Sequence, residues 1–417
     1  MPYWPIVAES RTTAIPRPVR ITLTRPAERA AIFRSDVSLL FVANPQAGRI
    51  GGIQRQSRRL YEALGQQFPT QTLADTWQGR GPANRNRRLN RHAVKEPIVY
   101  CDAAVSSIIG TTLFGRSTRK IVGTVHGLDI IAPVPAYQRR VRAALRRLDR
   151  VVCVSDATAA EVARFGVHPE RIAVIHNPAE PYVPAHLGRA KARGQLQSLL
   201  GVDLVDRKII LSVGRPVRRK GFDQFIRRVF RDLPEDYVYI VAGPELTEPT
   251  WVRLGRPFMS ARRRRNLLVA TGYYSSHRDL VRLSTHPRVC YLNGVSDAVR
   301  DLLYAAADLF VLPNRRVPGD MEGFGIVALE AATREVPVVA FGIEGITDAV
   351  IDGRNGYCIA DGDYRAMREK ILMLLRDPDG LRRFGRSAAA FTADRFAIDR
   401  ITQKYSDLLI DLAQSQN

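Results

Sequence analysis

Cysteine is scarce in this sequence of 417 residues, and its four cysteines lie far apart. They are Cys101, Cys153, Cys290 and Cys358. No two of them show the Cys-x-x-Cys spacing that zinc sites and thiol redox motifs require. We therefore expect four reduced cysteines that serve as small core residues.

Long apolar runs are also absent. No stretch of about 18 uncharged apolar residues occurs, and the nearest candidate, Ile98 to Gly115, contains Asp102 and several other polar residues. The N-terminus has no continuous apolar segment of the kind found in a secretion signal. These absences predict a cytoplasmic protein without a membrane-spanning helix.

Lysine is scarce too, with 7 lysines against 56 arginines. The net charge is nevertheless +22 and is uneven, because residues 1–200 hold 30 basic and 13 acidic side chains while residues 201–417 hold 33 and 28. A basic N-terminal half indicates an anionic partner, either nucleic acid or an anionic membrane surface. The arginine excess also fits a bias in genomic base composition.

The chain is longer than one hydrophobic core supports, which is about 250 to 300 residues, so we expect two domains. Residues 1–35 are interrupted by prolines and have no hydrophobic period, which predicts a poorly ordered extension. We place the N-terminal domain at residues 36–190, the C-terminal domain at residues 191–390, and a C-terminal helix at residues 391–417.

Ten apolar runs, separated by helical patterns, follow one another along the chain. They lie at residues 37–43, 98–101, 120–126, 150–155, 172–176, 208–214, 237–243, 289–292, 308–313 and 336–340. Buried strands that alternate with helices predict parallel sheets covered on both faces. We therefore expect an α/β fold with two doubly wound, Rossmann-like domains and a ligand cleft at the carboxyl ends of the strands.

A glycine-bounded basic segment, Gly214-Arg-Pro-Val-Arg-Arg-Lys220-Gly221, directly follows one of these strands. Glycine lets the backbone approach a ligand, and Arg215 and Lys220 can offer two cations to a diphosphate. The alternative is a solvated basic turn in an arginine-rich protein. The segment alone does not decide between the two interpretations.

A second segment, Glu322-Gly-Phe-Gly-Ile-Val-Ala-Leu-Glu330, has two glycines ahead of a helix that we expect to begin near Ile326. The helix start directs free backbone N–H groups and the positive end of the helix dipole at the loop. Glu330, about one turn inside the helix, is suited to accept hydrogen bonds from paired hydroxyl groups such as those of a ribose. Alternatively, both carboxylates lie near the helix start for dipole reasons alone.

Together, the Arg-x4-Lys-Gly and Glu-x7-Glu segments resemble those of glycosyltransferase family 4. The resemblance runs from about Asp36 to the end of the chain and is strongest from Ile209 to Gly356. It implies the GT-B fold, in which two Rossmann-like domains face a cleft and a C-terminal helix crosses back to the N-terminal domain. It also implies a retaining hexosyltransferase that uses a nucleotide sugar and needs no metal or other cofactor.

The resemblance assigns roles to single residues. Arg215 and Lys220 would hold the donor diphosphate, Glu330 the nucleotide ribose, and Glu322 the hydroxyl groups of the transferred sugar. The remaining donor-binding positions are glycines and one aromatic residue whose backbone approaches the donor: Gly51, Gly52, Gly214, Gly323, Phe324 and Gly325.

In the N-terminal half, His126 with Gly127 matches a position beside the sugar, so we count His126 with Arg215, Lys220 and Glu322 as the expected catalytic set. Without the resemblance, His126 would be interpreted as a structural histidine. Two further residues, Ser155 and Asn177, match positions that line the cleft.

Two segments depart from the family pattern. The family often has Gly-Gly-x-Pro-Glu where this chain has Glu344-Gly-Ile-Thr-Asp348, which puts contacts from that loop to the donor in doubt. The chain is also longer than usual between Gly243 and Val289, where four consecutive arginines, Arg262–Arg265, occur.

The acceptor must be inferred from the N-terminal half. Residues 138–150 place Val141, Leu145 and Leu148 at helical spacing among arginines, and residues 80–95 add further basic side chains. Basic amphipathic helices are typical of membrane surfaces. We therefore predict a peripheral protein on the inner face of the cytoplasmic membrane that acts on a lipid-linked, lipopolysaccharide or exopolysaccharide glycan. The alternative is an ordinary packed helix with an arginine-rich outer face.

The donor is expected to be GDP-mannose, on family frequency alone. One rival hypothesis is a glycosyltransferase with a soluble acceptor. Another is a basic nucleic-acid-binding protein, but the sequence has no zinc-finger spacing, RNP motif or convincing helix-turn-helix, so we expect no nucleic-acid partner.

Overall fold

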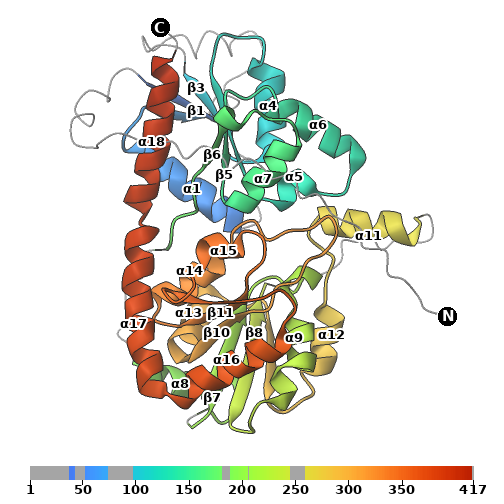
Figure 1. Cartoon of the computed structure of the whole chain (residues 1–417), viewed down its shortest axis with the longest axis vertical. Helices are drawn as coiled ribbons and strands as arrows, with labels where there is room; N and C mark the ends of the chain where they lie inside the picture. Colours follow the sequence, from blue (N-terminus) through green and yellow to red (C-terminus); the bar gives the residue numbers. More distant parts are fainter. Residues whose placement is uncertain are drawn as a thin grey trace, which may run out of the picture.

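The computed structural model describes residues 37–42, 52–73, 97–180, 188–204, 206–244 and 259–415. The expected N-terminal extension, Gly51 and the basic stretch at residues 80–95 lie outside these described residues. Within them, the chain forms two α/β halves that lie one above the other in Figure 1. Each half is built around one sheet of six strands.

The N-terminal half contains the strands β1 (Leu39–Val42), β2 (Thr70–Thr72), β3 (Ile98–Cys101), β4 (Ile121–Val125), β5 (Arg150–Cys153) and β6 (Ile172–Val174). All neighbouring strands are parallel, in the order β2-β1-β3-β4-β5-β6. The main helices of this half are α1 (Gly52–Gly65), α4 (Ala104–Phe114), α5 (Leu128–Ile131), α6 (Pro135–Leu145) and α7 (Asp156–Arg164).

The C-terminal half contains the strands β7 (Lys208–Val213), β8 (Tyr237–Gly243), β9 (Val289–Asn293), β10 (Leu309–Leu312), β11 (Val338–Phe341) and β12 (Gly356–Ile359). They are also parallel, in the order β12-β11-β10-β7-β8-β9. The helices described here are α8 (Arg189–Leu200), α9 (Phe222–Arg228), α11 (Ala261–Ala270), α12 (His277–Leu283), α13 (Asp297–Ala306), α14 (Ile326–Thr333), α15 (Ile346–Ala349) and α16 (Tyr364–Arg376).

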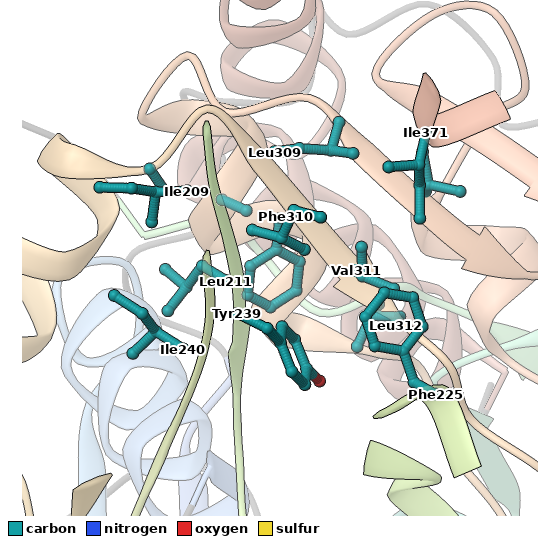
Figure 2. Close-up of a cluster of buried hydrophobic side chains, with 14 of the residues drawn as sticks. Ile209, Leu211, Phe225, Tyr239, Ile240, Leu309, Phe310, Val311, Leu312 and Ile371 are labelled. Atoms are coloured by element: carbon teal, nitrogen blue, oxygen red, sulfur yellow. The ribbon is translucent and has the colours of Figure 1, made fainter. Parts of the chain in front are cut away.

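Buried apolar strands account for this architecture. Every residue of β1, β3, β4, β8 and β10 is buried, as expected for parallel strands that helices cover on both faces. Figure 2 shows the core of the C-terminal half, where Leu211, Tyr239 and Phe310 from three adjacent strands lie with Phe225 and Ile371 from flanking helices. The predicted fold class, two doubly wound Rossmann-like halves, is confirmed.

All ten predicted strands form, although most are one or two residues shorter than the apolar runs. The two strands that the sequence did not predict are β2 and β12, and each lies at an edge of its sheet. Strand β2 reads Thr-Gln-Thr and is only partly buried. An edge strand has a neighbour on one side only, so it does not need the continuous apolar run that marks a central strand.

The C-terminal helices connect the two halves. Helix α17 (Pro378–Arg395) packs on α14, and α18 (Ile398–Gln414) then runs up one side of the molecule to the N-terminal half (Figure 1). There, Ile401, Tyr405 and Leu409 enter the same core as β1 and β3. The C-terminal helix therefore crosses back to the N-terminal domain, as the GT-B fold requires.

Helix α6 is the basic amphipathic helix of the sequence, and its apolar side is already occupied. Val141, Leu145 and the following Leu148 are completely buried in the core that α6 shares with α4 and β5. The apolar side of α6 is therefore not available to a membrane, and the structure shows the packed helix with an arginine-rich outer face. None of the described helices is both long enough and apolar enough to span a bilayer.

Replacement of Leu409 by alanine tests the docking of α18, because this side chain is completely buried in the N-terminal core. We expect Leu409→Ala to lower the free energy of unfolding by about 2–5 kcal/mol. Leu199→Ala is the matched control, since Leu199 on α8 is 57% exposed and its loss should change stability by less than about 0.5 kcal/mol. Urea unfolding followed by circular dichroism measures both, and equal midpoints would contradict the docking.

Candidate active site

The C-terminal sheet reverses its chain order between β7 and β10, and open parallel sheets bind ligands at the carboxyl ends of strands at such a point. Gly214 directly follows β7, and Asn314 lies just after β10. The loops after these strands pack closely, because a Cβ atom on Gly221 would collide with the carbonyl oxygen of Pro313. Gly221 also has a φ of 67°, which favours glycine.

A buried ion cluster joins these two loops. The Glu322 carboxylate oxygen Oε2 accepts hydrogen bonds from Lys220 Nζ at 2.6 Å and Asn314 Nδ2 at 2.7 Å, and also from Arg219. Arg219 also contacts Asp320 at 3.0 Å. Lys220 and Arg219 are only 7% and 6% exposed. Glu322 and Lys220, which the sequence placed in one site, are therefore in direct contact.

Charge in this cluster is stabilised by mutual pairing. Burial would raise the pKa of Glu322, but Arg219 and Lys220 outweigh it and hold the pKa at about 2. Burial lowers the pKa of Lys220, and Glu322 opposes that shift. Burial also acts against charge on Arg219, but Glu322 and Asp320 raise its pKa overall. Glu322 is thus ionised at neutral pH, and Lys220 is held beside its counter-charge.

Arg215 differs from Lys220 in being exposed. Its guanidinium lies against Gly272, at the end of the segment that carries α11. This segment packs on the basic loop, since the Arg218 amide donates to the Tyr274 carbonyl and the Ser276 amide donates to the Pro216 carbonyl, both at 2.8 Å. Arg215 is therefore positioned by packing and remains open to a ligand.

The arginine run Arg262–Arg265 lies on α11, which projects from the side of the molecule in Figure 1. Arg262 and Arg263 are exposed, whereas Arg265 donates to the Pro318 carbonyl at 3.3 Å and lies 5.6 Å from the centre of the Tyr274 ring. Pro318 belongs to the loop that follows β10. The α11 segment thus borders the mouth of the site.

Two helix N-termini meet at the boundary between the halves. Helix α14 begins at Ile326, as predicted, after Gly325 with a φ of 90°. Helix α1 begins at Gly52, and a Cβ atom there would lie 3.8 Å from Ile326 Cδ1. Both helix starts present free N–H groups and a positive dipole end, which favours an anion between them.

Glu330 lies in the second turn of α14 and is 6% exposed. Its Oε2 accepts a hydrogen bond from the Tyr304 hydroxyl at 3.1 Å. Burial raises the pKa of Glu330, and Arg300 opposes this shift. Nearby, Glu180 pairs with Arg59 of α1 and lies 3.8 Å from Arg334, the residue that follows α14. Glu330 is therefore beside an ion network that joins the two halves.

His126 lies where the two halves touch. Its Nε2 is 2.8 Å from the Asp102 carbonyl oxygen, and because a carbonyl only accepts, Nε2 carries a proton. The next residue, Gly127, has a φ of 105°, and a Cβ atom there would lie 2.9 Å from Gly323 Cα. A Cβ atom on Gly323 would collide with the His126 carbonyl oxygen. The His-Gly and Gly-Phe-Gly segments therefore meet.

Three other expected positions are buried. The Phe324 ring is 2% exposed and stacks on His176 with centroids 5.4 Å apart, so its side chain anchors the loop. Ser155 is completely buried and caps α7 by accepting a hydrogen bond from the Thr158 amide. Asn177 is 7% exposed and lies in the segment after β6. All three lie close to the boundary between the halves.

A pocket of about 510 Å³ opens beside the ion cluster, between α7 and the loops after β10 and β11. Its walls include Asp156 and Arg164 from the N-terminal half and Asp320, Met321 and Glu344 from the C-terminal half. The loop that departs from the family pattern therefore lines a cavity next to Glu322. Neither Arg219 nor Glu344 was singled out from the sequence, although Arg219 lies within the basic segment.

No group of three or more potential metal ligands occurs among the described residues. Asp361 and Asp363 have a spacing that occurs in metal-binding carboxylate pairs. Asp361 pairs with Arg316 at 3.1 Å, and Asp363 caps α16 through the Ala366 amide at 2.9 Å. These contacts account for both carboxylates. The site can thus bind an anion and a polyol through cations, helix N-termini and carboxylates.

Comparisons with known proteins agree with this geometry. Residues 203–391 match the family model described as glycosyl transferases group 1, and residues 54–181 match that of glycosyltransferase family 4. The GDP-mannose-dependent alpha-(1-6)-phosphatidylinositol monomannoside mannosyltransferase of Mycolicibacterium smegmatis is 29% identical over 309 residues, which is 71% of each chain. The N-acetyl-alpha-D-glucosaminyl L-malate synthase of Bacillus anthracis is 23% identical and covers 76% of this chain and 72% of its own length.

Among solved structures, Alr3699/HepE of Anabaena in complex with UDP-glucose superimposes with a TM-score of 0.64 at 19% identity, covering 90% of this chain and all of its own. That similarity supports the same two-domain fold. The two family models cover most of both halves, and the Arg-x4-Lys and Glu-x7-Glu segments lie together at the strand ends. The chain belongs to glycosyltransferase family 4, and it is a glycosyltransferase with the GT-B fold.

Proposed function

We propose that this glycosyltransferase moves a hexose, with mannose from GDP-mannose favoured, onto a lipid-linked, lipopolysaccharide or exopolysaccharide glycan with retention of configuration. The observation that carries the proposal is the ion cluster of Lys220 and Glu322 beside two converging helix N-termini. The mannosyltransferase from Mycolicibacterium, whose name states GDP-mannose as donor, supports the choice of sugar.

The departing diphosphate develops negative charge, and the site is suited to stabilise that charge without a metal or other cofactor. Arg215 and Lys220 supply two cations, and the first turns of α1 and α14 carry N–H groups that have no partner within their own helix. Fixed charges and dipoles of this kind need no reorganisation as the bond breaks. We therefore assign the diphosphate to these groups.

We assign the binding of the sugar and of the ribose to two carboxylates. Glu330 is assigned to the ribose hydroxyls, and Glu322 to hydroxyls of the transferred hexose, which the Gly323 backbone and His126 flank. Attack by the acceptor hydroxyl from the face that the diphosphate leaves would retain the configuration. No covalent enzyme intermediate is then required.

We assign the acceptor glycan to a membrane, and we place the enzyme on the anionic inner face of the cytoplasmic membrane. The only acidic residue between Ala103 and Leu148 is Asp129, and it accepts the His126 amide rather than facing outward. Arg139 and Arg140 on α6 are exposed. A soluble acceptor is the second candidate, because the apolar side of α6 is buried and the similar Bacillus anthracis protein is named for a soluble acceptor, L-malate.

Lysine 220 provides the test of the donor site. We expect Lys220→Ala to lower transfer from GDP-mannose by about 100-fold or more, because a fixed charge on the leaving group is lost. Glu330→Ala should likewise abolish transfer. Lys208→Ala is the matched control, since Lys208 lies at the other end of the same strand, β7. Circular dichroism checks that each variant folds.

Ligand binding is measured separately by thermal shift with GDP, UDP and their sugars. A ligand that binds only the native state raises the melting temperature, so the wild type should respond to at least one nucleotide sugar and Lys220→Ala should not. Near-normal turnover by Lys220→Ala would refute the site assignment. Failure of every nucleotide and nucleotide sugar to shift the wild type would refute the function.

Flotation with liposomes tests the membrane assignment. We expect recovery with anionic vesicles but not with neutral ones, and a loss of binding as salt rises, because exposed charges are screened over about 10 Å at 0.1 M salt. The double variant Arg139→Glu/Arg140→Glu should bind less. Arg383→Glu/Arg386→Glu changes the same charge on the exposed side of α17 and is the control. Equal recovery with both vesicle types would contradict the anionic surface, and no recovery with either type would favour the soluble acceptor.

A further inference from the structure

Glu344 has an unusual backbone for its residue type. It follows β11 and has a φ of 51°, a left-handed conformation that glycine adopts freely and other residues adopt at a cost. Apart from Glu344, Glu335 is the only other non-glycine residue with a positive φ in the described part of the chain. A strained backbone of this kind persists where surrounding contacts hold it.

The contact that holds Glu344 is with the backbone of Glu322, the residue assigned to the transferred sugar. Its Oε2 accepts a hydrogen bond from the backbone amide of Glu322 at 2.5 Å. The amide of the next residue, Gly345, donates to the carbonyl oxygen of Glu322 at 3.1 Å. Both polar groups of the Glu322 backbone are thus bonded to residues 344 and 345. A Cβ atom on Gly345 would collide with the Gly323 carbonyl, so the two loops are pressed together.

The same side chain faces the pocket between the halves. Its carboxylate is 11% exposed, and Oε1 lies 4.0 Å from Arg316 Nη1 at the pocket edge. Glu322 meanwhile uses its own Oε2 for Lys220, Arg219 and Asn314. The direction of the Glu322 side chain therefore depends on its backbone, which hydrogen bonds from residues 344 and 345 hold in place.

We propose that Glu344 is a positioning residue of the sugar site, whose carboxylate holds the Glu322 backbone so that the Glu322 side chain meets Lys220. The proposal rests on the proposed function, because it assigns the transferred sugar to this loop. It assigns a role to the loop of residues 344–348, which departs from the family pattern in sequence. It also predicts that Glu344 acts more strongly on turnover than on diphosphate binding, because Glu344 bonds to the Glu322 backbone, whereas Arg215 and Lys220 lie in the separate loop after β7.

Three variants separate positioning from general stability. Glu344→Gly removes the carboxylate but tolerates the left-handed backbone, and Glu344→Gln keeps an acceptor oxygen without the charge. Glu335→Gly is the matched control, because it relieves the other strained backbone away from the pocket. Circular dichroism and the melting temperature confirm that each variant folds.

Hydrogen exchange of the ligand-free protein is the first measurement. In Glu344→Gly we expect the Glu322 amide to exchange about 10-fold faster than in the wild type, as the loss of a charge-assisted hydrogen bond implies. Glu344→Gln should stay within about 3-fold of the wild type, because a neutral acceptor remains. Glu335→Gly should leave this amide unchanged. If the Glu322 amide of Glu344→Gly exchanges at the same rate as in the wild type, the proposal is overturned.

Turnover of GDP-mannose is the second measurement. Glu344→Gly should lower kcat by about 10-fold while the donor KM changes by less than about 3-fold, and Glu344→Gln should restore most of the kcat. If the wild type fails to turn over any nucleotide sugar while Glu344→Gly still exchanges faster, the proposed function fails and the backbone contact stands. If the wild type is active and Glu344→Gly matches it in kcat, the positioning role is refuted.

The charge state of Glu344 gives a pH test of the same contact. The pKa of Glu344 is raised to about 7, mainly by burial and also by the charge of Glu322, while the Glu322 amide, Arg219 and Arg316 act in the opposite direction. The other charged groups around the pocket are Asp156, Glu161, Arg164, Asp320 and Asp348. Because the folded pKa lies above the ordinary value of 4.5, stability from this group is full at low pH and is lost as pH rises through about 7.

Glutamine does not titrate, so Glu344→Gln lacks this loss of stability. From about pH 5 to about pH 8, its melting temperature should therefore rise relative to that of the wild type. Glu335→Gly should show the same pH dependence as the wild type. A constant difference between the wild type and Glu344→Gln across this range would mean that residue 344 does not carry the buried charge, and it would overturn this part of the proposal.

Discussion

The pairing of Glu322 with Lys220, Arg219 and Asn314 is the interaction on which the C-terminal half of the site depends. It joins the loop after β7 to the loop after β10, which no strand pairing holds together beyond the sheet. A buried pair of charges is costly to form, and the loss of one partner leaves the other without compensation. The four side chains therefore stabilise one another, and each loop keeps its shape only while the other is in place.

The second constraint is the contact between the halves, and glycine makes it possible. Gly127 and Gly323 bring two backbones so close that a side chain on either would collide. Elsewhere the halves are joined by polar pairs, such as His176 with Asp348 at 3.1 Å. The site is thus made by both halves together, since neither half alone brings the two helix N-termini into one place.

Much of this arrangement could be predicted from the sequence, because its signals are local. A central parallel strand must be apolar throughout, so all eight central strands were recognised, together with the edge strands β6 and β9, and Gly323 and Gly325 marked the start of α14 at Ile326. Edge strands carry a weaker signal, and β2, with the sequence Thr-Gln-Thr, was missed. The motif residues Lys220 and Glu322 were recognised through a resemblance that includes the order and spacing of both segments.

The features that escaped prediction depend on tertiary contacts. Three consecutive basic residues, Arg218 to Lys220, form a 3₁₀ turn, and only the packed turn decides that Arg219 faces Glu322. Helical spacing showed that α6 has an apolar side, but not that α4 and β5 cover it. In the sequence, Glu344 was only a departure from the glycine of the family pattern. Its role could not be predicted, because its partner, the Glu322 amide, is 22 residues away in the chain.

Arg215 and Lys220 were predicted as equivalent cations, and the structure places them in different surroundings. Lysine carries three N–H donors, so Lys220 can keep its bond to Glu322 and still donate to a phosphate oxygen. Its position is fixed before a ligand arrives, which limits its reach but lowers the entropy lost on binding. Arg215 is exposed and has a planar fork that suits two phosphate oxygens. In the proposed donor site, Lys220 would therefore connect the diphosphate to the carboxylate assigned to the sugar, and Arg215 would add a second, bidentate contact to the diphosphate.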